Sequence, residues 1–102
     1  MRRPQGSWYD NKRKDKLPAY ILKNDGALNY FVSSIYLQKL KDRGAILEEE
    51  DAEWMKIRTA DSQNPGKQPR RLVKLNLEIG MYRLSARFMV FDLADYDIIL
   101  GK

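Results

Sequence analysis

The chain has 102 residues, of which 43% are hydrophobic and 32% charged, and a formal net charge of +5, which suits one small domain with a thin core. It contains no Cys and no His, so disulfides, thiolate nucleophiles, imidazole bases and the usual zinc sites are excluded, and we expect neither a metal nor a cofactor. No apolar run approaches the roughly 20 residues of a membrane span, and no apolar signal core follows Arg2 and Arg3, so we expect an intracellular protein, cytoplasmic or nuclear, with no membrane partner.

The first segment, residues 1–16, contains turn formers and a charge run at residues 12–16, which predicts a basic, flexible N-terminal arm. A solvated basic tail is the simplest interpretation of these charges. The alternative is a nucleic-acid surface, because cations beside Trp8 and Tyr9 suit phosphates and stacked bases. The candidate cations for nucleic acid are Lys12, Arg13, Lys14, Arg70 and Arg71.

The next segment predicts a strand, a turn and a helix in that order. Residues 17–22 form a short apolar run rich in strand formers, and the Asn-Asp-Gly sequence of residues 24–26 ends it with a turn. Ser33 or Ser34 can then cap a short helix that ends at Gly44. The apolar positions expected near one face of this helix are Ile35, Leu37 and Leu40.

The second half of the chain predicts further strands. Residues 54–59 alternate and should form a strand that leads into a hairpin tip at residues 60–69. Alternation over residues 73–79 and 82–90 predicts two antiparallel strands joined by a tight turn. Short strands with one helix and no βαβ rhythm indicate a mainly β domain, a small partly closed β-barrel.

The most specific pattern lies at the end of the chain, where residues 93–101 read Leu-Ala-Asp-Tyr-Asp-Ile-Ile-Leu-Gly. Two other patterns precede it: Gly-Ala-Leu-Asn-Tyr-Phe-Val-Ser over residues 26–33 and Thr-Ala-Asp-Ser over residues 59–62. In this order, residues 17–102 resemble the retropepsin-like aspartic proteases of Ty3/gypsy retrotransposons. The resemblance implies a barrel of the acid protease type, an active-site loop, a flap, and a buried strand that ends in a structural turn at Gly101 behind the loop.

The resemblance also assigns the catalytic position. Counting back from Gly26 places Asn24 at the position of the catalytic Asp and Asp25 at that of the following Ser or Thr. Such enzymes are dimers in which two aspartates share one proton, and an amide cannot accept that proton. We therefore expect the aspartic endopeptidase activity to be lost. The alternative is an active homodimer in which Asp25 supplies the carboxylate.

Members of this family continue past the glycine into a short helix and a final strand that joins the dimer. The chain reaches Lys102, so we expect a domain of residues 17–102 that lacks this helix and strand. Either the segment was removed, or the protein pairs differently, for example through a partner strand added to an open sheet edge.

The leading hypothesis from the sequence is a retroelement-derived, inactive aspartic-protease-like domain that binds a protein or an extended peptide, with a homodimer as one arrangement. An active endopeptidase and a basic nucleic-acid-binding module are the two alternatives. The candidate residues of the active-site loop are Asn24, Asp25, Gly26 and Ala27, and those of the flap are Asp61, Ser62, Gln63, Asn64, Pro65, Gly66 and Lys67.

Overall fold

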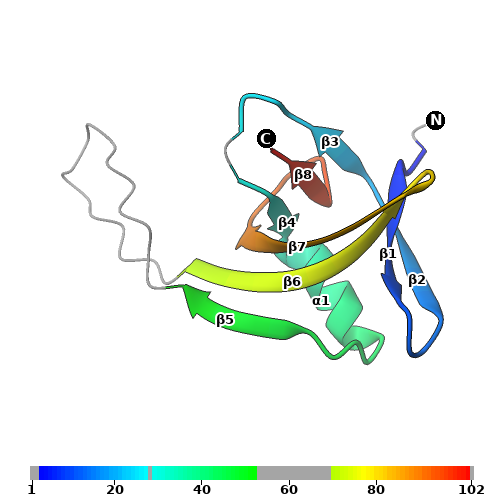
Figure 1. Cartoon of the computed structure of the whole chain (residues 1–102). Coiled ribbons are helices and arrows are strands. Elements are labelled where there is room, and N and C mark those ends of the chain that lie inside the picture. The colour runs from blue at the N-terminus through cyan, green and yellow to red at the C-terminus, as the bar shows by residue number, and fades with distance from the viewer. Residues whose placement is uncertain (1–2, 28, 53–69, 102) are drawn as a thin grey trace.

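A computed structural model describes residues 3–27, 29–52 and 70–101 and shows a mainly β domain with one helix and a nearly closed barrel (Figure 1). The fold class predicted from the sequence is confirmed at this level. The sheet order is β2-β1-β6-β7-β4-β8-β3, and β5 pairs with β6 outside this path. The elements are β1 (Gly6–Asp10), β2 (Asp15–Ala19), β3 (Ile21–Lys23), β4 (Phe31–Ser33), α1 (Ser34–Asp42), β5 (Glu48–Ala52), β6 (Arg70–Ile79), β7 (Tyr82–Phe91) and β8 (Ile98–Leu100).

The N-terminal residues differ from the expected flexible arm, because β1 and β2 form an antiparallel hairpin that belongs to the domain. The Trp8 side chain is only 3% exposed and lies in the hydrophobic core, while β1 also pairs with β6. The charged turn is held locally, since Asp10 Oδ1 accepts from the backbone N–H groups of Lys12 (3.0 Å) and Arg13 (3.3 Å). The apolar anchor therefore outweighs the charge run that predicted an arm.

The predicted strand pair after residue 70 is confirmed as the long hairpin of β6 and β7, whose register runs from Leu72↔Met89 to Ile79↔Tyr82. Gly80, at the first central position of its turn, has φ +59°, which glycine adopts at little cost. Val73, Leu75 and Leu77 are almost fully buried, so this face of β6 looks into the core.

The predicted strand at residues 17–22 is divided into β2 and β3 by Tyr20. Its N–H donates to Asp97 Oδ2 (2.9 Å), and its carbonyl accepts from the N–H groups of Asp97 (2.9 Å) and Ile98 (3.1 Å). These bonds direct β3 to pair parallel with β8, while β4 lies between β8 and β7, antiparallel to the first and parallel to the second. The two ends of the barrel sheet, β2 and β3, are thus joined through one residue.

The predicted helix is confirmed as α1, which Ser33 caps by accepting from the N–H of Ile35 (3.2 Å), and Gly44 follows it with φ +83°. Its expected buried face was wrong at one position, because Ile35 is 66% exposed and Tyr36 is buried in its place. The Tyr36 hydroxyl donates to the carbonyl of Leu17 (2.6 Å), so its one polar group is satisfied inside the protein.

The acidic residues 48–51 form an edge strand, β5, although Glu and Asp disfavour strands. Neighbouring cations compensate for these charges: Glu49 accepts ion pairs from Lys41 of α1 (3.0 Å) and from Arg71 of β6 (2.7 Å). The Lys41 hydrogen bond, with help from Arg71, lowers the pKa of Glu49. The ion pairs with basic side chains of α1 and β6 therefore allow this acidic segment to form a strand.

Candidate functional site

The loop after β3, residues 24–27, is a compact β-turn that the Asn24 side chain and backbone build together. The Ala27 N–H donates to the Asn24 carbonyl (3.0 Å), and the Gly26 N–H donates to Asn24 Oδ1 (3.1 Å). Neither Asp25 nor Gly26 has a positive φ, so the turn is of the common type in which an Asn at the first position is favoured. Asn24 thus has a structural role as the organiser of this loop.

Strand β8 supports the loop from behind. The Asn24 N–H donates to the carbonyl of Leu100 (2.8 Å), which continues the parallel pairing of β3 and β8. A Cβ on Gly101 would lie 2.4 Å from the carbonyl oxygen of Asn29 and 2.7 Å from that of Ala27. The requirement for glycine at position 101 is therefore close approach of the loop backbone, since no left-handed φ occurs there.

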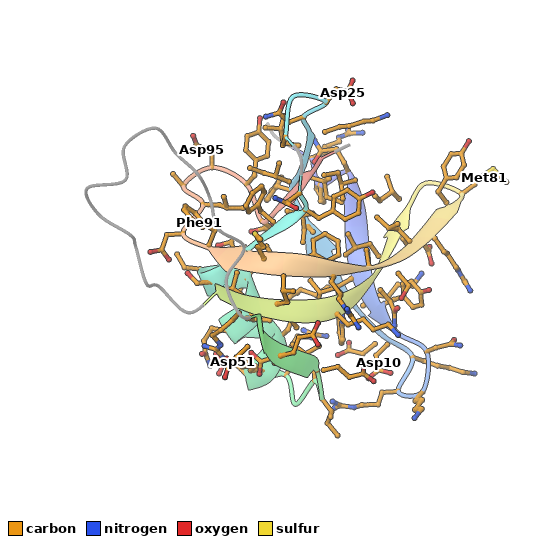
Figure 2. All side chains as sticks on the ribbon, turned by 60° about the vertical axis from the view of Figure 1, so that its left-hand side comes forward. Asp10, Asp25, Asp51, Met81, Phe91 and Asp95 are labelled. Carbon is orange, nitrogen blue, oxygen red and sulfur yellow. The ribbon has the colours of Figure 1, made fainter. Side chains whose placement is uncertain are left out.

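The chemistry of the loop is set by one amide and one carboxylate. Asn24 and Asp25 are both exposed, and the Asn24 amide oxygen is already used by the Gly26 N–H. Figure 2 shows Asp25 at the outer tip of the loop. Within the described residues Asp25 takes part in no hydrogen bond or ion pair, so its carboxylate is free of partners there. The loop can therefore accept hydrogen bonds through the Asp25 carboxylate and donate them through the Asn24 amide.

A row of apolar side chains, which we call the outer row, starts beside this loop and was not predicted from the sequence. It consists of direct register partners on five successive strands: Leu22 with Ile99, Ile99 with Phe31, Phe31 with Met89, and Met89 with Leu72. Directly paired residues of neighbouring strands point to the same face of a sheet, so these five side chains form one band.

The outer row lies on the face of the sheet opposite the core. Each residue of the outer row is followed or preceded in its strand by a residue of the core cluster: Ile21, Val32, Val73, Phe88 and Ile98. Among the described residues, the core cluster contains no member of the outer row. Met89 is 6% exposed and the other four are half-buried. Phe91, which is 56% exposed, extends the band through an edge contact with Phe31, with the ring centroids 6.1 Å apart. Side-by-side apolar groups on a partly open face offer a surface for an apolar ligand.

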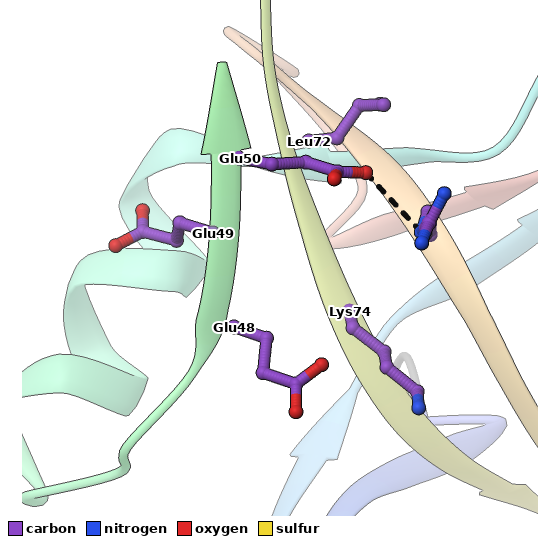
Figure 3. A pocket seen from close by; sticks show the side chains of 6 residues that line it. Glu48, Glu49, Glu50, Leu72 and Lys74 are labelled. Carbon is purple, nitrogen blue, oxygen red and sulfur yellow. Dashed lines mark ion pairs between the residues drawn. The ribbon is translucent and has the colours of Figure 1, made fainter. Parts of the chain in front are cut away.

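Charged side chains border the outer row at its Leu72 end. Here a hollow of about 70 Å³ is lined by Leu72, Lys74, Arg87 and three glutamates of β5, and the ion pair of Glu50 Oε1 with Arg87 Nε (3.2 Å) crosses it (Figure 3). Small-molecule sites usually measure about 300 Å³ or more, so this hollow is too small for one. It marks the polar boundary of the band.

The flap residues predicted from the sequence, residues 61–67, lie outside the described residues, as does the strand expected at residues 54–59. Of the predicted site residues, the structure therefore brings together the loop residues 24–27 and the structural glycine, Gly101, in direct backbone contact.

Two of the predicted nucleic-acid cations, Arg13 and Arg71, are engaged within the protein. Arg13 donates to the carbonyl oxygens of Gly44 (2.6 Å) and Arg43 (3.2 Å), and Arg71 is paired with Glu49. Lys12 and Arg13 line a hollow of about 470 Å³ next to the β1–β2 turn, but Asp10 and Glu48 line it as well. Lys14 is exposed in that turn, and the backbone of Arg70 begins β6. This mixed-charge arrangement does not favour a row of phosphates.

The described part of the chain contains neither a group of side chains that could hold a metal ion nor a helix that could span a membrane. No cluster of three or more acidic side chains there could hold a metal ion. The one described helix, α1, is too short and too polar to cross a membrane. Comparison of the chain with protein-family models gave no match, and comparison with curated proteins gave none either.

Proposed function

We propose that this chain is a retroelement-derived, aspartic-protease-like domain that has lost peptidase activity and binds an extended peptide along the outer row. The observation that carries the proposal is the placement of this band directly beside the loop of residues 24–27. An extended peptide has alternating side chains, so every second one can contact the band. Leu22 and Ile99 lie at the loop end, and Leu72 lies at the polar end.

The loss of peptidase activity follows from the loop chemistry. An amide at position 24 cannot act as a general base, and removal of a general base typically lowers the rate by about 10² to 10⁴. The amide instead closes the turn through its oxygen, which keeps the loop in place without a carboxylate. Peptide binding does not require the carboxylate pair, so the outer row beside the loop can bind a peptide without catalysis.

The activity part of the proposal is tested by incubating the purified protein with a library of quenched fluorescent peptides between about pH 4 and 7, a range that includes the upper pKa, about 4.7, of the aspartate pair in pepsin. We expect no cleavage from the protein or from an Asp25→Ala variant. Cleavage that disappears in Asp25→Ala would contradict the proposal and support the alternative in which Asp25 is catalytic.

The binding part is tested with labelled peptides of alternating apolar and polar residues, by fluorescence anisotropy. Phe31→Ser should weaken binding, because it removes the centre of the outer row. Tyr82→Ser is the control, since Tyr82 is an exposed aromatic (81%) that lies at the far end of β7 from the outer row. Circular dichroism confirms that both variants fold. Equal loss of binding in both variants, or binding unaffected in both, would contradict a site on the outer row.

A further inference from the structure

The charges of the molecule are divided between two regions in a way that its net charge hides. Residues 24–38 and 88–101 contain four aspartates and no Lys or Arg, so together they carry a charge of −4, while the whole chain carries +5. The remaining residues therefore carry +9. The two acidic segments include β4, β8 and the end of β7, and so they supply Phe31, Met89 and Ile99 of the outer row.

Two of the four aspartates accept hydrogen bonds from other residues of the domain. Asp97 accepts the Tyr20 N–H and is half-buried, and Asp92 accepts the Ser34 hydroxyl (2.5 Å). The other two, Asp25 and Asp95, are exposed and have neither a hydrogen bond nor an ion pair with any described residue. Figure 2 shows them on two separate loops, with Phe91 on the side of Asp95. These two carboxylates remain available to a ligand.

Both carboxylates lie close to the outer row along the chain. Asp25 is three residues from Leu22, and Asp95 is four residues from Ile99, which limits the backbone separations to about 11 and 14 Å. These separations are similar to the Debye length of about 10 Å at 0.1 M salt, so both carboxylates can attract a positively charged ligand bound on the row. Lys23 borders the loop end of the row, but strand alternation directs it to the face opposite Leu22. Lys74 and Arg87 lie at the other end, beside Leu72, where three glutamates line the same hollow and Glu50 pairs with Arg87.

We infer that the peptide bound by the outer row is basic: an extended segment whose apolar side chains are flanked by Lys or Arg residues that pair with Asp25 and Asp95. The inference rests on the proposed function and adds the charge of the partner to it. The overall charge of the protein favours the opposite preference, for acidic partners. A measured preference for basic peptides would therefore be due to the local carboxylates, because the net charge alone would favour acidic peptides.

The test uses three peptides with the same alternating apolar centre, flanked by Lys, by Ser or by Glu, and measures affinity by fluorescence anisotropy at low salt and at about 0.5 M salt. We expect the Lys-flanked peptide to bind about three- to tenfold more tightly than the Ser-flanked one at low salt, with the Glu-flanked peptide weakest. High salt should remove most of the difference. The double variant Asp25→Asn with Asp95→Asn should remove it at low salt.

Asp51→Asn is the matched control, because Asp51 is also exposed but lies on β5, outside the acidic segments. It should leave the Lys preference unchanged. Equal affinity for the three peptides, or a preference for Glu, would overturn the inference while leaving the proposed peptide site intact. Absence of binding by all three would overturn the proposed function and the inference together. A Lys preference that survives in the double variant would also overturn the assignment to these two carboxylates.

Discussion

Strand β8 places one isoleucine on each face of the sheet, and the two faces have different surroundings. Ile98 has 0% exposure and lies in the core cluster with Val32, Phe88 and the buried side chains of α1. Ile99, the next residue, belongs to the half-buried outer row. The difference separates side chains that stabilise the fold from side chains that the proposed function uses for binding, although both sets are equally apolar in the sequence.

The largest expected effect comes from changing these two isoleucines separately. Ile98→Ala should destabilise the domain by about 2–5 kcal/mol, because it leaves a cavity in the core. Ile99→Ala should cost about 1 kcal/mol or less and should weaken peptide binding by about fivefold. Urea unfolding and peptide anisotropy measure the two effects. If Ile98→Ala does not fold, the Ile→Val changes at both positions give a smaller version of the same comparison. Equal destabilisation at both positions would contradict the distinction between the faces.

The two glycines of the loop region differ in a similar way. Gly101→Ala should destabilise by about 3 kcal/mol, because the new Cβ meets two carbonyl oxygens that cannot move without displacing the loop. Gly26→Ala should change stability by less than about 1 kcal/mol, since its nearest neighbour is the Asn24 side chain at 3.3 Å and its φ is not left-handed. Hydrogen exchange at the Asn24 and Ala27 amides reports the loop directly. Similar exchange in both variants would show that Gly101 does not hold the loop.

Two ion pairs between partly exposed side chains predict how the stability of the domain responds to acid. Arg43 forms a two-pronged contact with Asp15 and lowers its pKa, and Lys41 similarly lowers the pKa of Glu49. A lowered carboxyl pKa adds stability that is complete at neutral pH, declines as the pH falls below about 4, and is gone below the lowered pKa. Arg43→Gln should therefore reduce the acid dependence of urea unfolding. An unchanged dependence would mean that Asp15 does not contribute.

The smallest effect is expected at the polar end of the outer row. Arg87→Ala breaks the pair with Glu50, but both side chains are at least half exposed, so the cost in unfolding free energy should be below about 1 kcal/mol. Added salt should reduce this cost further. A loss above about 2 kcal/mol would indicate that the pair, and not the apolar band, organises this end of the sheet.

Local signals predicted the parts of the fold that local interactions decide. A serine cap and a glycine terminator located α1, and strict alternation with a tight Gly80 turn located β6 and β7. The β1–β2 hairpin was missed because its turn ends in Lys14 with a positive φ of 51°, where glycine or asparagine would have signalled a turn. Strand β5 was missed because its strand-forming tendency comes from basic neighbours distant in the sequence.

The candidate site was predictable only in its loop. The position of Asn24 followed from spacing, but its bonds to Gly26, Ala27 and Leu100 required the structure. The outer row could not be read from the sequence, because its residues are spread from position 22 to position 99 and meet through two parallel pairings. Such pairings depend on the register between distant strands, which alternation within one strand does not specify.

The hydrogen bond between Asn24 and Leu100 has a consequence for the order of folding. On the ribosome, the loop of residues 24–27 is made early, but the strand that supports it, β8, is made about 75 residues later, at the ordinary pace of some 5–20 residues per second. The loop can reach its final shape only after Gly101 has emerged, and the closure of so long a chain segment is slow compared with the formation of α1. The candidate site should therefore be among the last parts of the domain to form.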